Sequence, residues 1–108
     1  MRFEIVLLGD AEQFIDTLDA KTRTKVLYNI KKSQHIQDSN LFKKLNKYIW
    51  EFRTRHNRQT IRLLAFWAKD EREARLVVCT HGFTKKTAQT PKQELRRAEK
   101  IRREYLNH

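Results

Sequence analysis

The residue types best suited to chemistry gather in one short stretch, residues 80–94, which reads THGFTKKTAQTPKQE. The imidazole of His81 can accept or donate a proton near neutral pH. Lys85 and Lys86 follow shortly after it and can neutralise phosphate oxygens, while the ring of Phe83 offers a surface on which a base can stack. These residue types suit proton transfer beside a phosphate backbone.

Basic residues are concentrated in a second stretch as well. The chain has 24 Lys and Arg against 13 Asp and Glu, a formal net charge of +11. Residues 43–62 contain one acidic residue, Glu51, and the basic residues Lys43, Lys44, Lys47, Arg53, Arg55, Arg58 and Arg62. So strong a positive field predicts a polyanionic partner: nucleic acid first, an acidic protein second and an anionic membrane third.

Length and cysteine content bound the class of protein. A chain of 108 residues is expected to form a single domain over residues 1–108. Its single cysteine, Cys79, lies in an apolar run, which predicts a buried thiol and a reducing, cytoplasmic location. The apolar N-terminal run is too short for a signal peptide or a membrane span. Because the sequence lacks zinc-type ligand spacing and a glycine-rich phosphate loop, no metal or cofactor is expected.

The elements that must position these residues can be read from the hydrophobic pattern. Residues 3–8 carry a strand signal. A helix capped by Asp10 and a second helix over residues 21–35 then predict a helical hairpin. Residues 38–46 are expected to be a connection.

After this connection the period changes from helical to alternating. Runs at 48–55, 59–68 and 74–84 are separated by short polar turns, which predicts a three-stranded antiparallel meander. A capping box of Thr90 and Gln93 around Pro91 then opens a basic C-terminal helix. The expected fold is therefore α+β, with an N-terminal strand, a helical hairpin, a three-stranded antiparallel meander and a C-terminal helix.

Alternation along the middle strand divides its side chains between two faces. One face carries Ile61, Leu63, Ala65 and Trp67, and the other carries Thr60, Arg62, Leu64 and Phe66. Arg62 inside so apolar a strand is either functional or held by a salt bridge, for which Glu51 is the candidate. His81 could equally be an ordinary hydrogen-bonded residue, and Phe83 either a core anchor or a stacking platform. Trp50, Phe52 and Trp67 are expected in the core.

Basic residues interleaved with aromatic ones suit single-stranded RNA better than duplex DNA. The sequence shows no helix-turn-helix, zinc-finger or zipper signature. The residues expected to hold an RNA backbone or bases are Lys43, Lys44, Lys47, Arg55, Arg58, Phe83 and Lys85.

The segments IWEFR, IRLLAF and HGFTKKTAQTPKQE, in this order of elements, resemble the RelE/ParE toxin superfamily of bacterial toxin–antitoxin systems. The nearest branch is that of the phage-derived, HigB-type RelE-like toxins, which share a comparable H-G-F-x-K-K-T followed by T-P. The resemblance covers nearly the whole chain and implies the RelE-like microbial RNase fold. It also implies the toxin of a type II system, an mRNA interferase that inhibits translation by cleaving mRNA in the ribosomal A site beside the 16S rRNA, and a cognate antitoxin protein.

The implied reaction is metal-independent RNA cleavage, in which the 2′-OH attacks the adjacent phosphodiester. Arg62, at a position similar to one that the family uses, is the first candidate to stabilise the phosphorane charge, and Arg53 is the second. His81 is the candidate for proton transfer. Lys85 and Lys86 would hold the substrate or add positive charge. No acidic residue lies near His81 in the sequence to assist it.

Two other functions stay open at this point. Members of the superfamily that resemble ParE inhibit DNA gyrase, and they tend to lack the basic and proton-transfer side chains present here. A non-catalytic RNA- or DNA-binding module would need only the positive charge. Turnover is the property that separates a nuclease from such a module.

Overall fold

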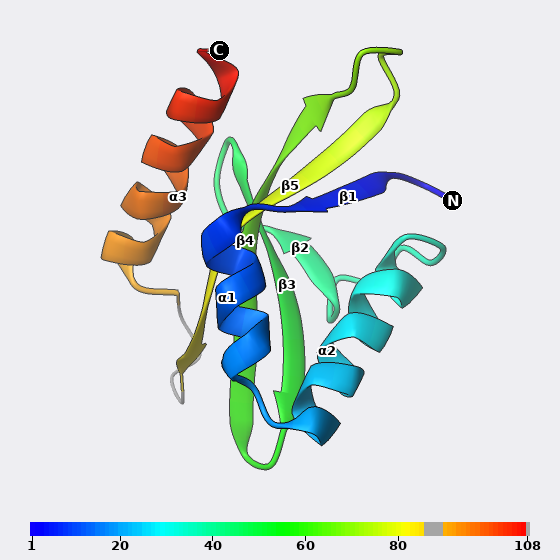
Figure 1. Cartoon of the computed structure of the whole chain (residues 1–108), viewed down its shortest axis with the longest axis vertical. Helices are drawn as coiled ribbons and strands as arrows, with labels where there is room; N and C mark the ends of the chain where they lie inside the picture. Colours follow the sequence, from blue (N-terminus) through cyan, green and yellow to red (C-terminus); the bar gives the residue numbers. More distant parts are fainter. Residues whose placement is uncertain (86–89, 108) are drawn as a thin grey trace.

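The computed structural model describes residues 1–85 and 90–107. The elements follow one another as β1 (Glu4–Leu7), α1 (Gly9–Thr17), α2 (Ala20–Ser33), β2 (Phe42–Lys44), β3 (Ile49–His56), β4 (Gln59–Lys69), β5 (Arg75–Lys85) and α3 (Lys92–Leu106). Helices α1 and α2 cover one face of the sheet and α3 lies against the other (Figure 1). The predicted α+β class is confirmed.

The five strands form one mixed sheet with the order β1-β5-β4-β3-β2. The pairs β2–β3, β3–β4 and β4–β5 are antiparallel, and β1 runs parallel to β5. The predicted meander is present as β3, β4 and β5, but it has a further strand. Residues 38–46 were expected to be a connection, whereas Phe42–Lys44 pairs with β3. The ring of Phe42 stacks on that of Phe52 at 4.2 Å, which fixes this short strand to the sheet.

Two predicted helix caps are wrong, because each side chain has a different partner. Asp10 lies inside α1, and its carboxylate accepts a hydrogen bond from Arg97 at 2.8 Å. The N-cap of α3 is Pro91, and among the described residues no side chain caps this helix. The hydroxyl of Thr90 instead bonds the carboxylate of Glu51 on β3. Both contacts hold α3 to the rest of the fold.

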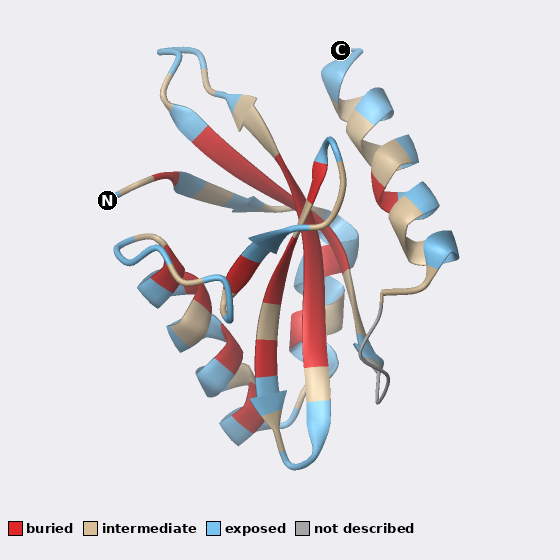
Figure 2. Cartoon of the chain, turned by 180° about the vertical axis from the view of Figure 1, so that it is seen from behind, coloured by how far each residue is buried: buried red, intermediate tan, exposed pale blue. Residues whose placement is uncertain are grey.

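The alternation predicted for β4 agrees with its packing. Ile61, Leu63 and Ala65 belong to the apolar cluster under α1 and α2, on what we call the α1–α2 face. Leu64 and Phe66 belong to the cluster under α3, on what we call the α3 face. Buried residues follow the middle of β3, β4 and β5, and the hairpin ends are exposed (Figure 2). No helix in the described ranges is long and apolar enough to cross a membrane.

A β-bulge interrupts the pairing of β4 with β5. Leu64 pairs with His81, but the next residue of β4, Ala65, pairs with Cys79, so Thr80 is an extra residue on β5. Because side chains alternate with a period of two, one extra residue moves the following side chains to the opposite face. His81 and Phe83 therefore lie on the α3 face, with Leu64 and Arg62.

Candidate functional site

Strand register brings the candidate residues together on the α3 face. Arg62 is paired with Arg53 on one side and with Phe83 on the other. One step along, Leu64 is paired with Glu51 and with His81. Partners in adjacent strands point to the same face, so these polar side chains form a patch across three strands. The N-terminal part of α3 covers one end of this patch and supplies Glu94.

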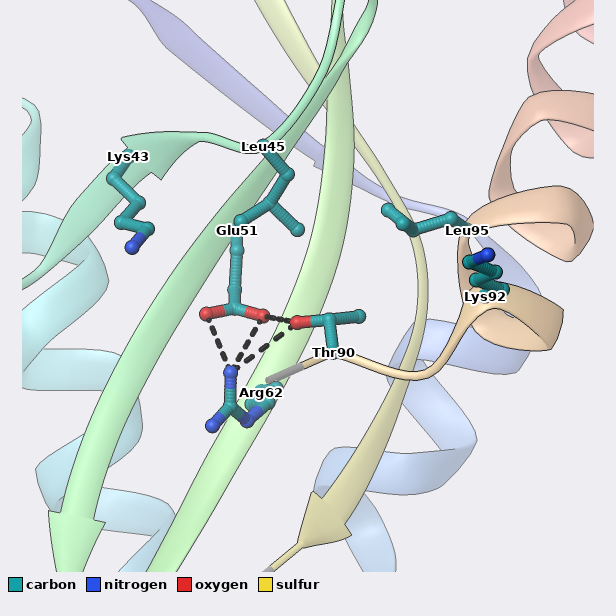
Figure 3. A pocket seen from close by; sticks show the side chains of 7 residues that line it. All are labelled: Lys43, Leu45, Glu51, Arg62, Thr90, Lys92 and Leu95. Carbon is teal, nitrogen blue, oxygen red and sulfur yellow. Dashed lines mark hydrogen bonds and ion pairs between the residues drawn. The ribbon is translucent and has the colours of Figure 1, made fainter. Parts of the chain in front are cut away.

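Arg62 is buried in an ion pair (Figure 3). Its Nη1 donates hydrogen bonds to both carboxylate oxygens of Glu51, at 3.0 and 3.1 Å, and to the hydroxyl of Thr90 at 3.2 Å. The Arg62 and Glu51 side chains are only 2% and 0% exposed. The salt bridge to Glu51, weighed as an alternative for Arg62, is thus present. Burying either charge alone would be costly, which explains why the two occur together.

Arg53 is the more accessible of the two arginines. Its side chain is 25% exposed, and its Nε lies 3.5 Å from Oε1 of Glu51. One carboxylate therefore serves two guanidinium groups, and the cluster keeps an excess of positive charge. Of the two guanidinium groups, that of Arg53 is therefore the one more open to solvent.

An open pocket of about 330 Å³ lies beside this cluster. Glu51, Arg62 and Thr90 line it together with two exposed lysines, Lys43 on β2 and Lys92 at the start of α3. The two lysines stand on opposite sides of the pocket (Figure 3). A phosphate group in the pocket would thus be flanked by two ammonium groups.

His81 has two polar neighbours on opposite sides of its ring. Its Nδ1 is 3.0 Å from the hydroxyl of Thr80, and its Nε2 is 3.6 Å from Oε1 of Glu94. The ring is 1% exposed and stacks near Phe83, with 6.1 Å between the ring centroids. Burial lowers the pKa of His81 from its ordinary 6.5, and Arg97 lowers it further, while Glu94 opposes the shift. The neutral ring is therefore favoured at neutral pH, and it could accept a proton beside a carboxylate.

The structure separates the remaining predicted residues. Arg55 continues the α3-face row toward the β3–β4 hairpin, and Arg58 is exposed in the turn of that hairpin. Lys44 pairs with Trp50 on the opposite, α1–α2 face. Lys47 lies in the β2–β3 turn over the ring of Tyr48.

The lysines that follow Phe83 are only partly placed. Lys85 is the last residue of β5 and pairs with Thr60, but its side chain lies outside the described residues. Lys86 lies outside them altogether. Their predicted roles therefore stay predictions.

Three residues of the site were missed by sequence reasoning. Thr90 was predicted to be a helix cap, and Lys92 and Glu94 were given no role at the site. The signal available in the sequence was the segment TPKQE, which places Glu94 in the first turn of the helix that follows β5. In the described ranges no cluster of three or more His, Cys, Asp or Glu could hold a metal ion.

Comparison with known proteins places the chain in a family. The family described as "Phage derived protein Gp49-like (DUF891)" matches residues 13–103, which extend from α1 into α3 and include all the site residues named above. No curated protein matches the chain. The chain belongs to the phage-derived, Gp49-like protein family.

Proposed function

We propose that the protein is the toxin of a type II toxin–antitoxin system and acts as a ribosome-dependent mRNA endoribonuclease. The observation that carries the proposal is the patch on the α3 face, where Arg53, Arg62 and Lys43 adjoin a buried histidine with a lowered pKa. Membership of a phage-derived family and the resemblance to RelE/ParE toxins agree with it. Such a toxin works in the cytoplasm, where translation takes place.

The reaction needs three groups besides the RNA. A base removes the proton of the 2′-OH, cations stabilise the phosphorane as the 2′-oxygen bonds to phosphorus, and an acid protonates the departing 5′-oxygen. The products are a 2′,3′-cyclic phosphate and a 5′-hydroxyl end. None of these steps requires a redox change or a co-reactant.

The geometry suggests which residue of this chain takes each role in the reaction. Arg53 is the more accessible guanidinium, with its side chain 25% exposed, and makes the direct contact with the phosphate. Arg62 holds Glu51 and joins the phosphate only if the substrate takes the place of that carboxylate. His81 accepts a proton at Nε2, where the carboxylate of Glu94 stabilises the imidazolium. Because the ring is buried, the 2′-OH reaches Nε2 only if Glu94 shifts enough to admit it while the carboxylate stays close enough to stabilise the imidazolium.

The same charge pattern suggests the partners. A basic pocket rimmed by Lys43 and Lys92 would attract an acidic segment of a cognate antitoxin, which would then block the site. Arg55 and Arg58 extend the basic surface toward the hairpin tip and would face the ribosomal A site and its 16S rRNA. An antitoxin complex that is unchanged by high salt and by Lys43→Glu would contradict the electrostatic part of this proposal.

A passive RNA-binding module is the second candidate, since the same cations would bind RNA without turnover. A ParE-like gyrase inhibitor is less favoured, because it would not need a buried histidine facing a carboxylate beside two arginines.

The deciding experiment is primer-extension mapping of mRNA cleavage in a reconstituted translation reaction. The lanes would hold wild-type protein, Arg53→Gln, His81→Gln and, as a control of equal charge change, Arg72→Gln. Arg72 is 85% exposed in the β4–β5 turn, away from the patch. Naked mRNA serves as a second control, and melting temperatures report whether each variant is folded.

We expect cuts only in translated message, lost with Arg53→Gln and His81→Gln and retained with Arg72→Gln. Cleavage that survives in folded His81→Gln would remove His81 from proton transfer. Folded wild-type protein that makes no cut would refute the nuclease, and a DNA-supercoiling assay would then test the gyrase inhibitor.

A further inference from the structure

A second basic pocket lies away from the candidate site. It has a volume of about 670 Å³ and opens where β2, the turn between β4 and β5, and the chain before β1 come together. Its charged lining consists of one acid, Glu73, and five cations, Arg2, Lys44, Lys47, Lys69 and Arg75. Excess positive charge in a concave surface concentrates anions there.

The pocket is on the opposite side of the sheet from Arg53 and Arg62. Lys44 pairs with Trp50, and Lys69 pairs with Arg75, all on the α1–α2 face. The hairpin end of β4 and β5, which carries Lys69 and Arg75, extends beyond α1 and α2 (Figure 1). A ligand bound here would therefore leave the α3 face free.

Both tryptophans of the chain, Trp50 and Trp67, line this pocket. They were expected in the core, and each packs against the core cluster under α1 and α2 while remaining partly exposed. Their rings meet edge to face at 5.7 Å, and the guanidinium of Arg75 lies over the Trp67 ring, 4.5 Å from its centroid. Indole and guanidinium planes are both surfaces on which nucleic-acid bases stack.

The cations of this pocket differ in whether they already have hydrogen-bond or ion-pair partners within the protein. The guanidinium of Arg2 donates to the carbonyl oxygens of Ser33 and Ile36 at the end of α2, so it is held in place. Lys44 and Lys69 are exposed and form no ion pair with any described residue. Two lysines can hold the phosphate of a nucleotide, and the neighbouring indole rings and the Arg75 guanidinium offer surfaces to its base.

We propose that this pocket is a second RNA-binding site, which takes a single-stranded segment with phosphates on Lys44 and Lys69 and a base against the Trp50–Trp67–Arg75 cluster. A single strand fits because its bases are free to stack, whereas those of a duplex are not. An acidic protein segment would use the lysines but not the aromatic planes. The site goes beyond the proposed function, since it binds RNA whether or not the α3 face cleaves it.

The test uses the tryptophans as the reporter. A short oligoadenylate with 2′-O-methyl sugars is titrated into the full chain, because it lacks the 2′-OH that cleavage would need. Tryptophan fluorescence reports occupancy of this pocket, and anisotropy of a labelled oligonucleotide reports total binding. The variants are Lys44→Gln/Lys69→Gln, a control pair of equal charge change on exposed α2 lysines, Lys31→Gln/Lys32→Gln, and Arg53→Gln on the α3 face.

We expect saturable quenching in the wild type, in the control pair and in Arg53→Gln. The Lys44→Gln/Lys69→Gln variant should weaken it and lower the slope of log K against log salt by about 0.7 per lysine. Binding seen by anisotropy without quenching would place the RNA elsewhere and overturn the proposal. So would an equal loss in both double variants, or equal quenching by polyglutamate, which would point to an acidic protein instead. The mRNA cleavage assay is read independently, so failure of either proposal is visible without the other.

Discussion

Replacing Glu51 with glutamine should destabilise the protein strongly, because it leaves Arg62 buried without a counter-charge. Glu51 is fully buried and accepts two hydrogen bonds from Arg62. Breaking a buried ion pair by removing one partner costs about 3–5 kcal/mol. Arg53 adds to the cost, because it is paired directly with Arg62 on the neighbouring strand and loses the carboxylate that separates the two positive charges. We therefore expect the loss for Glu51→Gln to lie in this range.

Related substitutions should lower the free energy of unfolding by amounts that follow a definite order. Arg62→Met should cost less, about 1.5–3 kcal/mol, since Arg53 and Thr90 remain to satisfy Glu51. Glu51→Leu combined with Arg62→Met removes both charges and should be close to neutral, as apolar replacement of a buried pair often is. The control is Asp10→Asn, which breaks the exposed Arg97–Asp10 pair and should cost about 0.2–1 kcal/mol.

Urea unfolding at neutral pH measures all four variants. A Glu51→Gln protein within about 0.5 kcal/mol of the wild type, or a double variant less stable than either single one, would refute this reading of the pair. The double variant also separates structure from function. If it is folded and yet no longer cleaves translated mRNA, while Asp10→Asn still does, the charge of the pair serves the reaction and not only the fold.

Three further predictions follow from individual residues. Gly82→Ala should destabilise the fold by about 1–3 kcal/mol, because a Cβ there would lie 2.2 Å from the ring of Phe14; a thermal melt should show the loss, and Phe14→Leu should recover part of it. Burial raises the pKa of the Cys79 thiol to about 12, so iodoacetamide should label the native protein far more slowly than the urea-unfolded chain. Because the folded pKa of His81 is lowered from 6.5, the unfolded chain takes up this proton first as the pH falls. The free energy of unfolding should therefore keep the His81 contribution above about pH 6.5 and lose it below. His81→Gln should flatten that step in urea titrations, and an equal slope in both proteins would contradict the assignment.

The sequence predicted those parts of the fold in which apolar residues recur with a regular period. Alternation along β4 placed Arg62 with Leu64 and Phe66 correctly, because an inner strand packed on both faces must divide its side chains between them. The strand β2 was not predicted, because its three residues are too few to show an alternating pattern. Its pairing depends on Phe42 finding Phe52, which is a tertiary contact.

The site was less predictable than the fold, because its polar pairs join distant segments. Glu51 was recognised from the sequence as a candidate partner for Arg62, and the two meet because their strands are neighbours in the sheet. Glu94 was not recognised for His81, since the two meet only when α3 folds back over the sheet. Thr90 fitted a capping pattern well, but Pro91 already fixes the start of α3, which leaves the hydroxyl free to bond Glu51.

The bulge at Thr80 explains why the spacing of T-H-G-F matters. Cys79 faces the α1–α2 side with Ala65, so strict alternation would put His81 on that side too, inside the apolar core. The extra residue exchanges the two faces for the residues after it. His81 and Phe83 lie on the α3 face, and Gly82 faces Phe14, whose ring a side chain at position 82 would clash with. The histidine and the glycine are thus two results of one backbone feature. A substitution that removed the bulge would take His81 away from Glu94 and, in the same step, bring Gly82 out from under α1.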